Sequence, residues 1–348
     1  MKQLLFIGIV IASFSCSSPE VQETNVDAST ADAQEKVETE ALEGVVMVPI
    51  KTKIGDFKVY TRQMGDNPTK RVLLLHGGPG GTYEFFKSFE DHFPQEDIEF
   101  IYYDQLGSHH SDSPSDTSLW TIERFVDEVE QVRVALGLDS SNFYLYGQSW
   151  GGILGAEYAL KHQDKMKGLI ISNMVMSIPE YSAYALNVLG PAMPDGVFEE
   201  IMAIEAKEDF SNPRYMELLM EHHYAEHILR MTPGEWPPAV VSAFVHLNPE
   251  VYVYMQGHSE FGVTAGATLA EWDITDRMKE LYVPTLSIGA THDSMDPEHM
   301  EWIASEVQNG RFLLCSNGSH LSQYDDPEHF FPGLIQFIHD VDAGVSMN

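Results

Sequence analysis

Cysteine and basic residues are scarce in this chain of 348 residues, and each shortage argues against a class of protein. One cysteine, Cys16, lies near the start, and Cys315 lies in an apolar segment that predicts a buried strand, so we expect no disulfide. Lys and Arg total 20 against 53 Asp and Glu, which gives a net charge of −33. Nucleic-acid binding requires a basic face and is therefore not expected.

A metal-binding motif is also missing. His223 and His227 have the i,i+4 spacing that could place two imidazoles on one face of a helix. However, the sequence has no His-Glu-x-x-His pattern, and no third ligand accompanies the pair. We therefore expect no metal site.

The N-terminal apolar run, Leu4–Phe14, is too short to cross a bilayer and indicates a secretory signal over residues 1–15. Cys16 then resembles the lipid-modified first residue of a bacterial lipoprotein, although Ser13 stands where that motif usually has leucine. Lipidation of Cys16 would anchor the protein to a membrane. Plain secretion, into the periplasm or beyond, is the alternative.

The segment that follows has too little apolar surface to fold. Residues 17–44 contain eight acidic residues, one lysine and no aromatic residue. Such a composition predicts disorder, so residues 16–44 are interpreted as an acidic flexible tether. An extracytoplasmic domain on a lipid anchor would need a tether of this kind.

The strongest positive signal is Gly-Gln-Ser-Trp-Gly at residues 147–151, between an apolar run and an alanine-rich helical stretch. Gly-x-Ser-x-Gly between a strand and a helix is typical of a nucleophile elbow. The turn strains the serine backbone, so only glycines fit beside it. Ser149 is the candidate nucleophile. The alternative is a glycine-rich turn whose serine merely caps the helix.

An earlier strand ends in His-Gly-Gly-Pro-Gly-Gly at residues 76–81. An N–H of this loop, from Gly77 or Gly78, would join the N–H of Trp150 in an oxyanion hole. An ordinary tight turn is the alternative. Folds with a nucleophile elbow place the catalytic acid and the catalytic histidine after the serine in the chain. His76 precedes Ser149, so it is interpreted as a residue that braces the loop and not as the catalytic base.

The acid and the base are expected further along the chain. Asp293 follows a predicted strand and could reach an imidazole over the sheet edge. Asp296 precedes Pro297 and a helical segment, so it is expected to cap that helix. His320 lies between the last predicted strand and the last predicted helix, the place of the general base.

The predicted elements alternate between strand and helix, which favours an α/β fold with a mostly parallel sheet covered on both faces. The predicted strands are residues 44–53, 56–63, 71–76, 98–103, 143–146, 166–172, 282–289 and 311–315. The predicted helices are residues 83–93, 121–136, 298–307 and 328–341. Core segments 45–175 and 279–342 flank a helical insertion, 176–278, that predicts a cap over the serine.

Four motifs together resemble the proline iminopeptidase family of α/β-hydrolase serine aminopeptidases, which includes the tricorn-interacting aminopeptidase. They are His-Gly-Gly-Pro-Gly at 76–80, Tyr-Tyr-Asp-Gln-Leu-Gly at 102–107, Gly-Gln-Ser-Trp-Gly-Gly at 147–152 and Gly-Ala-x-x-Asp-x-Met-Asp-Pro at 289–297. The resemblance covers about residues 45 to 340. It implies an α/β-hydrolase fold with an inserted helical cap, and short peptides with a free N-terminus as substrates.

The resemblance also implies that glutamates of the cap bind the α-amine of the substrate. Glu260 matches the family's Gly-x-x-Glu-Phe segment and is the first candidate, and Glu226 is the second. The chain departs from the family at His109, where relatives commonly have the second glycine of Asp-Gln-x-Gly-x-Gly-x-Ser. That substitution concerns the conformation of the loop, and not the triad.

The expected reaction is acyl transfer from a peptide to Ser149, with release of an N-terminal residue such as proline and no cofactor. Fold alone does not determine the scissile bond. An amino-acid amidase, esterase or lactonase on the same scaffold is therefore the nearer alternative. A surface binding protein without turnover is the other.

Overall fold

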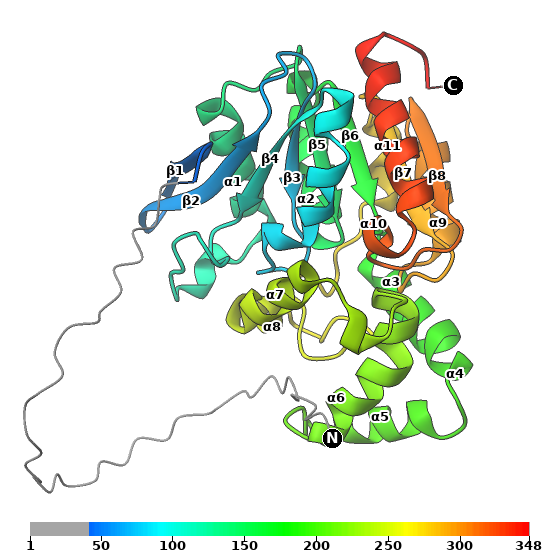
Figure 1. The fold of residues 1–348 in the computed structure, drawn as a ribbon. Helices are drawn as coiled ribbons and strands as arrows, with labels where there is room; N and C mark the ends of the chain where they lie inside the picture. The colour runs from blue at the N-terminus through cyan, green and yellow to red at the C-terminus, as the bar shows by residue number, and fades with distance from the viewer. Residues whose placement is uncertain (1–41, 348) are drawn as a thin grey trace, which may run out of the picture. The chain divides into compact units, whose positions relative to one another are not determined.

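An eight-stranded sheet organises residues 42–347, the part of the chain that the computed structural model describes (Figure 1). The strand order is β1-β2-β4-β3-β5-β6-β7-β8, and only the pairs β1·β2 and β2·β4 are antiparallel. The strands are β1 (Val45–Thr52), β2 (Gly55–Met64), β3 (Arg71–Leu75), β4 (Glu99–Asp104), β5 (Phe143–Gln148), β6 (Gly168–Ser172), β7 (Thr285–Ala290) and β8 (Gly310–Cys315). The prediction of a mostly parallel α/β sheet is confirmed.

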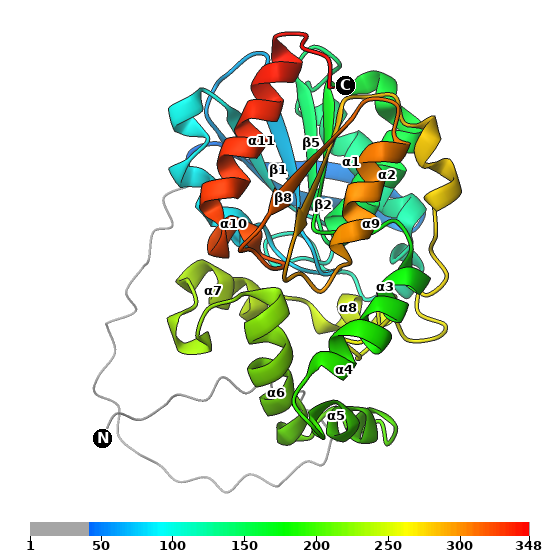
Figure 2. The ribbon, with the colours of Figure 1, turned by 90° about the vertical axis from the view of Figure 1, so that its right-hand side faces the viewer.

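Helices cover both faces of this sheet, as Figure 2 shows from the β8 edge. Side chains of β3 alternate between the two layers: Leu73 and Leu75 pack into one core, and Val72 and Leu74 into the other. The first layer contains α1 (Ile122–Ala135), α2 (Trp150–His162) and α9 (Pro297–Glu306). The second contains the 3-10 helix η1 (Tyr83–Asp91) and α11 (Pro327–Asp342). Because both faces of the sheet are buried, the sequences of the parallel strands are continuous apolar runs.

A helical insertion lies between β6 and β7, at the carboxyl ends of the parallel strands (Figures 1 and 2). It is called the cap below. Its elements are α3 (Ile178–Tyr184), η5 (Ala185–Leu189), α4 (Gly190–Ala192), α5 (Val197–Glu205), α6 (Pro213–Leu219), η6 (Met220–Ile228), η7 (Pro233–Glu235), α7 (Pro238–His246) and α8 (Pro249–Met255). A separate hydrophobic cluster that includes Leu218 and Phe261 stabilises part of it.

Five short helices remain, namely η2 (Pro94–Glu96), η3 (Thr117–Leu119), η4 (Gln163–Lys165), η8 (Thr275–Glu280) and α10 (Ser322–Asp325). None of the helices within residues 42–347 has the length and hydropathy of a membrane span. The predicted signal peptide, Cys16 and the predicted tether as far as residue 41 lie outside the described residues.

Candidate active site

The backbone at Ser149 has the strained geometry expected of an elbow between β5 and α2. Its φ is 55° and its ψ is −126°, values that a non-glycine residue rarely adopts. A β-carbon on Gly147 would lie 2.0 Å from the Gly151 carbonyl oxygen, and one on Gly151 would lie 2.1 Å from the Leu75 oxygen, so both positions require glycine. The Ser149 side chain makes no capping hydrogen bond with α2, which excludes the helix-cap alternative.

Asp293 and His320 meet where β7 and β8 end. His320 Nδ1 lies 2.8 Å from Asp293 Oδ1, and both side chains are buried. The other carboxylate oxygen, Oδ2, accepts a 2.7 Å hydrogen bond from Asn173 Nδ2. Because a carboxylate can only accept, the His320 proton is on Nδ1, and Nε2 carries the lone pair. Asp296 accepts from the Glu298 N–H at the start of α9, the capping role predicted for it.

The residue before Ser149 connects the elbow to the histidine loop. Gln148 Nε2 donates a 3.0 Å hydrogen bond to the His320 carbonyl oxygen. Within residues 42–347 the Ser149 hydroxyl makes no hydrogen bond. Catalytic hydrogen bonds often close only in the substrate complex, so we expect Ser149 Oγ to meet His320 Nε2 when substrate binds.

The loop at residues 76–81 passes beside Ser149. A β-carbon on Gly77 would lie only 3.0 Å from the Ser149 β-carbon, so glycine at this position lets the loop approach the elbow closely. His76 Nδ1 donates to the Gly77 oxygen at 2.8 Å, and its Nε2 accepts from the Gln105 N–H at 3.1 Å. Burial lowers the pKa of His76, which keeps the ring neutral. The prediction that His76 braces the loop is confirmed.

The cap is attached to the same loops. The His320 N–H donates to the His227 oxygen of η6 at 3.0 Å, and the Asn248 N–H donates to the Gly80 oxygen at 2.8 Å. These backbone bonds join the cap to both the histidine loop and the glycine loop. A change in the position of the cap would therefore be felt at both sides of the site.

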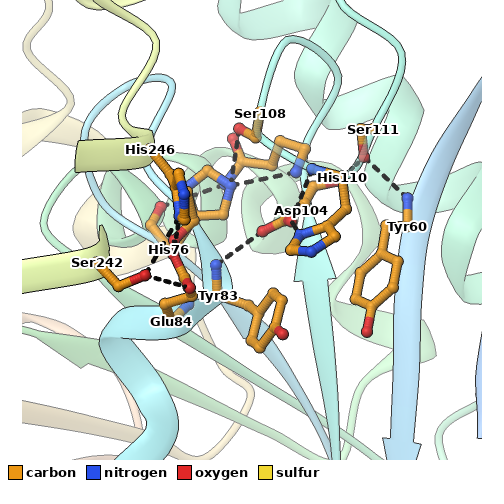
Figure 3. A network of polar contacts seen from close by, with 12 residues as sticks. Tyr60, His76, Tyr83, Glu84, Asp104, Ser108, His110, Ser111, Ser242 and His246 are labelled. Atoms are coloured by element: carbon orange, nitrogen blue, oxygen red, sulfur yellow. Dashed lines mark hydrogen bonds and ion pairs between the residues drawn. The ribbon is translucent and has the colours of Figure 1, made fainter. Parts of the chain in front are cut away.

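His109, the departure from the family pattern, takes part in this attachment. Its ring stacks on that of His246 with 3.7 Å between centroids. Figure 3 shows His246 and Ser242 of α7 around Glu84 of η1, to which each makes a 2.7 Å contact. The backbone of His109 does not have a positive φ, so this position accommodates a side chain without strain.

Glu260 is held by two tyrosines of the cap. The hydroxyls of Tyr224 and Tyr252 donate to its Oε1 at 3.1 and 3.2 Å. Burial raises the pKa of Glu260, whereas the two tyrosine hydrogen bonds and the nearby His320 act in the opposite direction. Both hydrogen bonds to this carboxylate end on Oε1, so among the described residues Oε2 has no hydrogen-bond partner.

Residues 70–327 match the model of the alpha/beta hydrolase fold family. Proline iminopeptidases of Flavobacterium johnsoniae and Elizabethkingia meningoseptica are each 54% identical to the chain. Both alignments cover 85% of this chain, with 98% and 99% of the two relatives. The chain belongs to the proline iminopeptidase family of α/β-hydrolases. The solved structure of a proline iminopeptidase from Mycobacterium smegmatis is similar, with a TM-score of 0.77 and 27% identity over 86% of this chain and 99% of that one.

The family pattern did not indicate the acidic residue that lies beside Glu260. That residue is Glu205, at the end of α5, whose charge raises the pKa of Glu260. Its Oε1 accepts from the hydroxyls of Tyr215 at 2.7 Å and Ser259 at 3.0 Å. Glu226 is exposed on η6 and makes no hydrogen bond or ion pair within residues 42–347. No motif surrounds Glu205, so its sequence context could not have distinguished it from the many other glutamates.

His223 is a buried imidazole without a polar partner. Its side chain is 1% exposed, and neither ring nitrogen has a hydrogen-bond partner among the described residues. The rings of His227 and Phe261 lie at 5.6 and 5.0 Å. Burial, with smaller contributions from His227 and His320, lowers the pKa of His223 to about 3. Within residues 42–347 no group of three potential ligands is placed to hold a metal ion.

Replacing His223 with phenylalanine is expected to stabilise the protein by about 1 kcal/mol or more at pH 7, because two unsatisfied buried nitrogens are removed. The gain should grow on acidification. In the unfolded chain the His223 imidazole is protonated below about pH 6.5, whereas in the folded protein it stays neutral down to about pH 3. Between these two pH values the free energy of unfolding of the wild type therefore falls by up to about 1.4 kcal/mol for each unit by which the pH is lowered. Urea unfolding at pH 7 and pH 5 measures both effects.

His222→Phe, one residue earlier on the same helix, is the matched control, because His222 is partly exposed and lies beside Glu221. It should change stability little at either pH. A His223→Phe protein that was less stable than wild type at pH 7 would contradict the prediction.

Proposed function

We propose that this chain is a serine aminopeptidase that releases N-terminal proline from short peptides through an acyl-enzyme. The Glu260 carboxylate is the observation that carries the proposal. It is buried near enough to His320 for that residue to lower its pKa, and its Oε2 accepts no hydrogen bond from the described residues. A buried carboxylate near the catalytic histidine favours a substrate whose ammonium group is next to the scissile carbonyl. The relatives named proline iminopeptidase support proline as the residue released.

In the proposed mechanism, His320 Nε2 removes the proton from Ser149 Oγ while Asp293 orients the ring through Nδ1. The serine oxygen attacks the carbonyl carbon of the first peptide bond. The Trp150 N–H and an N–H of Gly77 or Gly78 stabilise the oxyanion. His320 then protonates the leaving amine, and water, activated by the same histidine, hydrolyses the ester to free the N-terminal residue.

The α-ammonium group is proposed to bind Glu260, with Glu205 as the second carboxylate. The sequence favoured Glu226 for the second place. Glu205 replaces it because its charge acts directly on Glu260, while Glu226 is exposed. Two neighbouring carboxylates repel each other when no substrate is bound, and a bound ammonium group relieves that repulsion.

Aminoacyl p-nitroanilides test the proposal directly. Wild-type protein should cleave prolyl p-nitroanilide, and N-acetylprolyl p-nitroanilide should be at least about tenfold poorer in kcat/KM, because loss of a charge-assisted hydrogen bond is worth about 1.5–3 kcal/mol. An esterase or lactonase would instead accept substrates without that amine. Ready cleavage of the acetylated anilide would overturn the aminopeptidase assignment.

We also propose that Cys16 carries a lipid anchor and that the enzyme is extracytoplasmic. The apolar run before Cys16 and the acidic segment after it support this. A multiply acylated cysteine holds a protein firmly on a membrane, whereas a single chain holds it weakly. Cys16→Ser should therefore release active enzyme from membranes. Equal membrane association of both proteins, with no lipid mass on the N-terminal peptide, would remove the proposal.

A further inference from the structure

Gln105 lies between the two halves of the proposed oxyanion hole. It directly follows β4 and is 1% exposed. Its side-chain Nε2 donates to the His76 carbonyl oxygen at 3.2 Å, and its Oε1 accepts from the indole Nε1 of Trp150 at 2.8 Å. One amide group therefore bridges the glycine loop and the residue after the nucleophile.

Because a peptide group is planar, the hydrogen bond from Gln105 to the His76 oxygen affects the direction of the next backbone N–H. The His76 carbonyl and the Gly77 N–H belong to one planar trans peptide, so they point in opposite directions. When Gln105 holds the His76 oxygen, it also sets the direction of the Gly77 N–H. The His76 ring holds the Gly77 oxygen in the same way and sets the direction of the Gly78 N–H. The backbone N–H of Gln105 in turn holds that ring through Nε2.

We propose that Gln105 is a positioning residue that sets the separation and direction of the two oxyanion donors, the Trp150 N–H and an N–H of the glycine loop. The inference rests on the proposed acyl-transfer function. Hydrogen bonds to an oxyanion form fully only in the transition state, so their misplacement lowers kcat and leaves KM nearly unchanged. Removal of a whole donor costs about 10²–10³ in kcat, and displacement of one should cost less.

Gln105→Met removes both hydrogen bonds and keeps the length of the side chain. It is expected to lower kcat about tenfold to thirtyfold for prolyl p-nitroanilide and for an ester alike, with KM within about twofold. Prolyl boronic acid, which forms a tetrahedral adduct on serine, should bind more weakly by a similar factor, while inhibition by free proline should be unchanged. Rates are calculated per active site, counted by titration with a fluorophosphonate, so that loss of folded protein does not imitate the effect.

Gln105→Glu provides the rescue. A protonated carboxyl can donate to the His76 oxygen and accept from Trp150, as the amide does, but an ionised carboxylate cannot donate. The kcat of Gln105→Glu relative to wild type should therefore rise as the pH falls, whereas that of Gln105→Met should stay flat. Gln163→Met is the matched control, because the Gln163 side chain also donates one hydrogen bond, to the Glu280 oxygen, and accepts another, from the Tyr282 N–H, without touching the elbow or the glycine loop. Its kcat should equal that of wild type.

An unchanged kcat in Gln105→Met, an equal loss of affinity for proline and the boronate, or a flat pH ratio for Gln105→Glu would each overturn the inference. A wild type that cleaves the ester but not the prolyl anilide would overturn the peptidase proposal instead. The effect of Gln105 could still be measured on the ester in that case.

Discussion

Ser149→Ala is expected to lower kcat for prolyl p-nitroanilide by about 10⁴–10⁶-fold with little change in thermal stability. The kcat values of Asp293→Ala and His320→Ala should be similarly low, because the three residues act as one unit and the loss of any one disables it. A triple variant should be little worse than the single ones. The activity that remains would come from substrate binding and the oxyanion donors.

Asp296→Ala is the control that distinguishes the two acids of this loop. It removes the cap of α9 and should cost about 1 kcal/mol of stability, with kcat unchanged. Activities should be compared at a temperature where every variant is folded, as judged by thermal unfolding. Retained activity in Asp293→Ala together with lost activity in Asp296→Ala would show that the acid has been assigned to the wrong residue.

Glu260→Gln is expected to reduce kcat/KM for peptides with a free N-terminus by about tenfold to a hundredfold, since a charge-assisted contact is worth about 1.5–3 kcal/mol. The amide oxygen can still accept from Tyr224 and Tyr252, so the cap should keep its conformation. An ester without an amine should be cleaved at nearly the wild-type rate, because the substitution leaves Ser149 and His320 untouched.

Glu226→Gln is the matched control for charge. It removes one carboxylate from the exposed face of the same cap and should leave both substrates unaffected. If Glu260→Gln lowered kcat/KM equally for substrates with and without an amine, Glu260 would be a structural residue, and the proposal for the ammonium site would fail.

The sequence alone determined those features that depend on a residue's own backbone or on its immediate neighbours in the chain. The elbow could be read because Gly147 and Gly151 have no room for a β-carbon, and no other residue satisfies that condition. Asp296 could be interpreted as a helix cap because proline follows it directly. The strands were predictable since a parallel sheet buried on both faces needs continuous apolar runs.

Contacts between distant segments were decided only by the tertiary structure. Glu205 and Glu260 are neighbours because α5 packs close to the segment after α8, and nothing in the spacing of the two glutamates indicates it. Gln105 reaches both His76 and Trp150 only because β4 lies beside β3, which in turn pairs with β5. A long-range hydrogen bond depends on which side chains packing brings within about 3 Å, and that distance has no local sequence pattern.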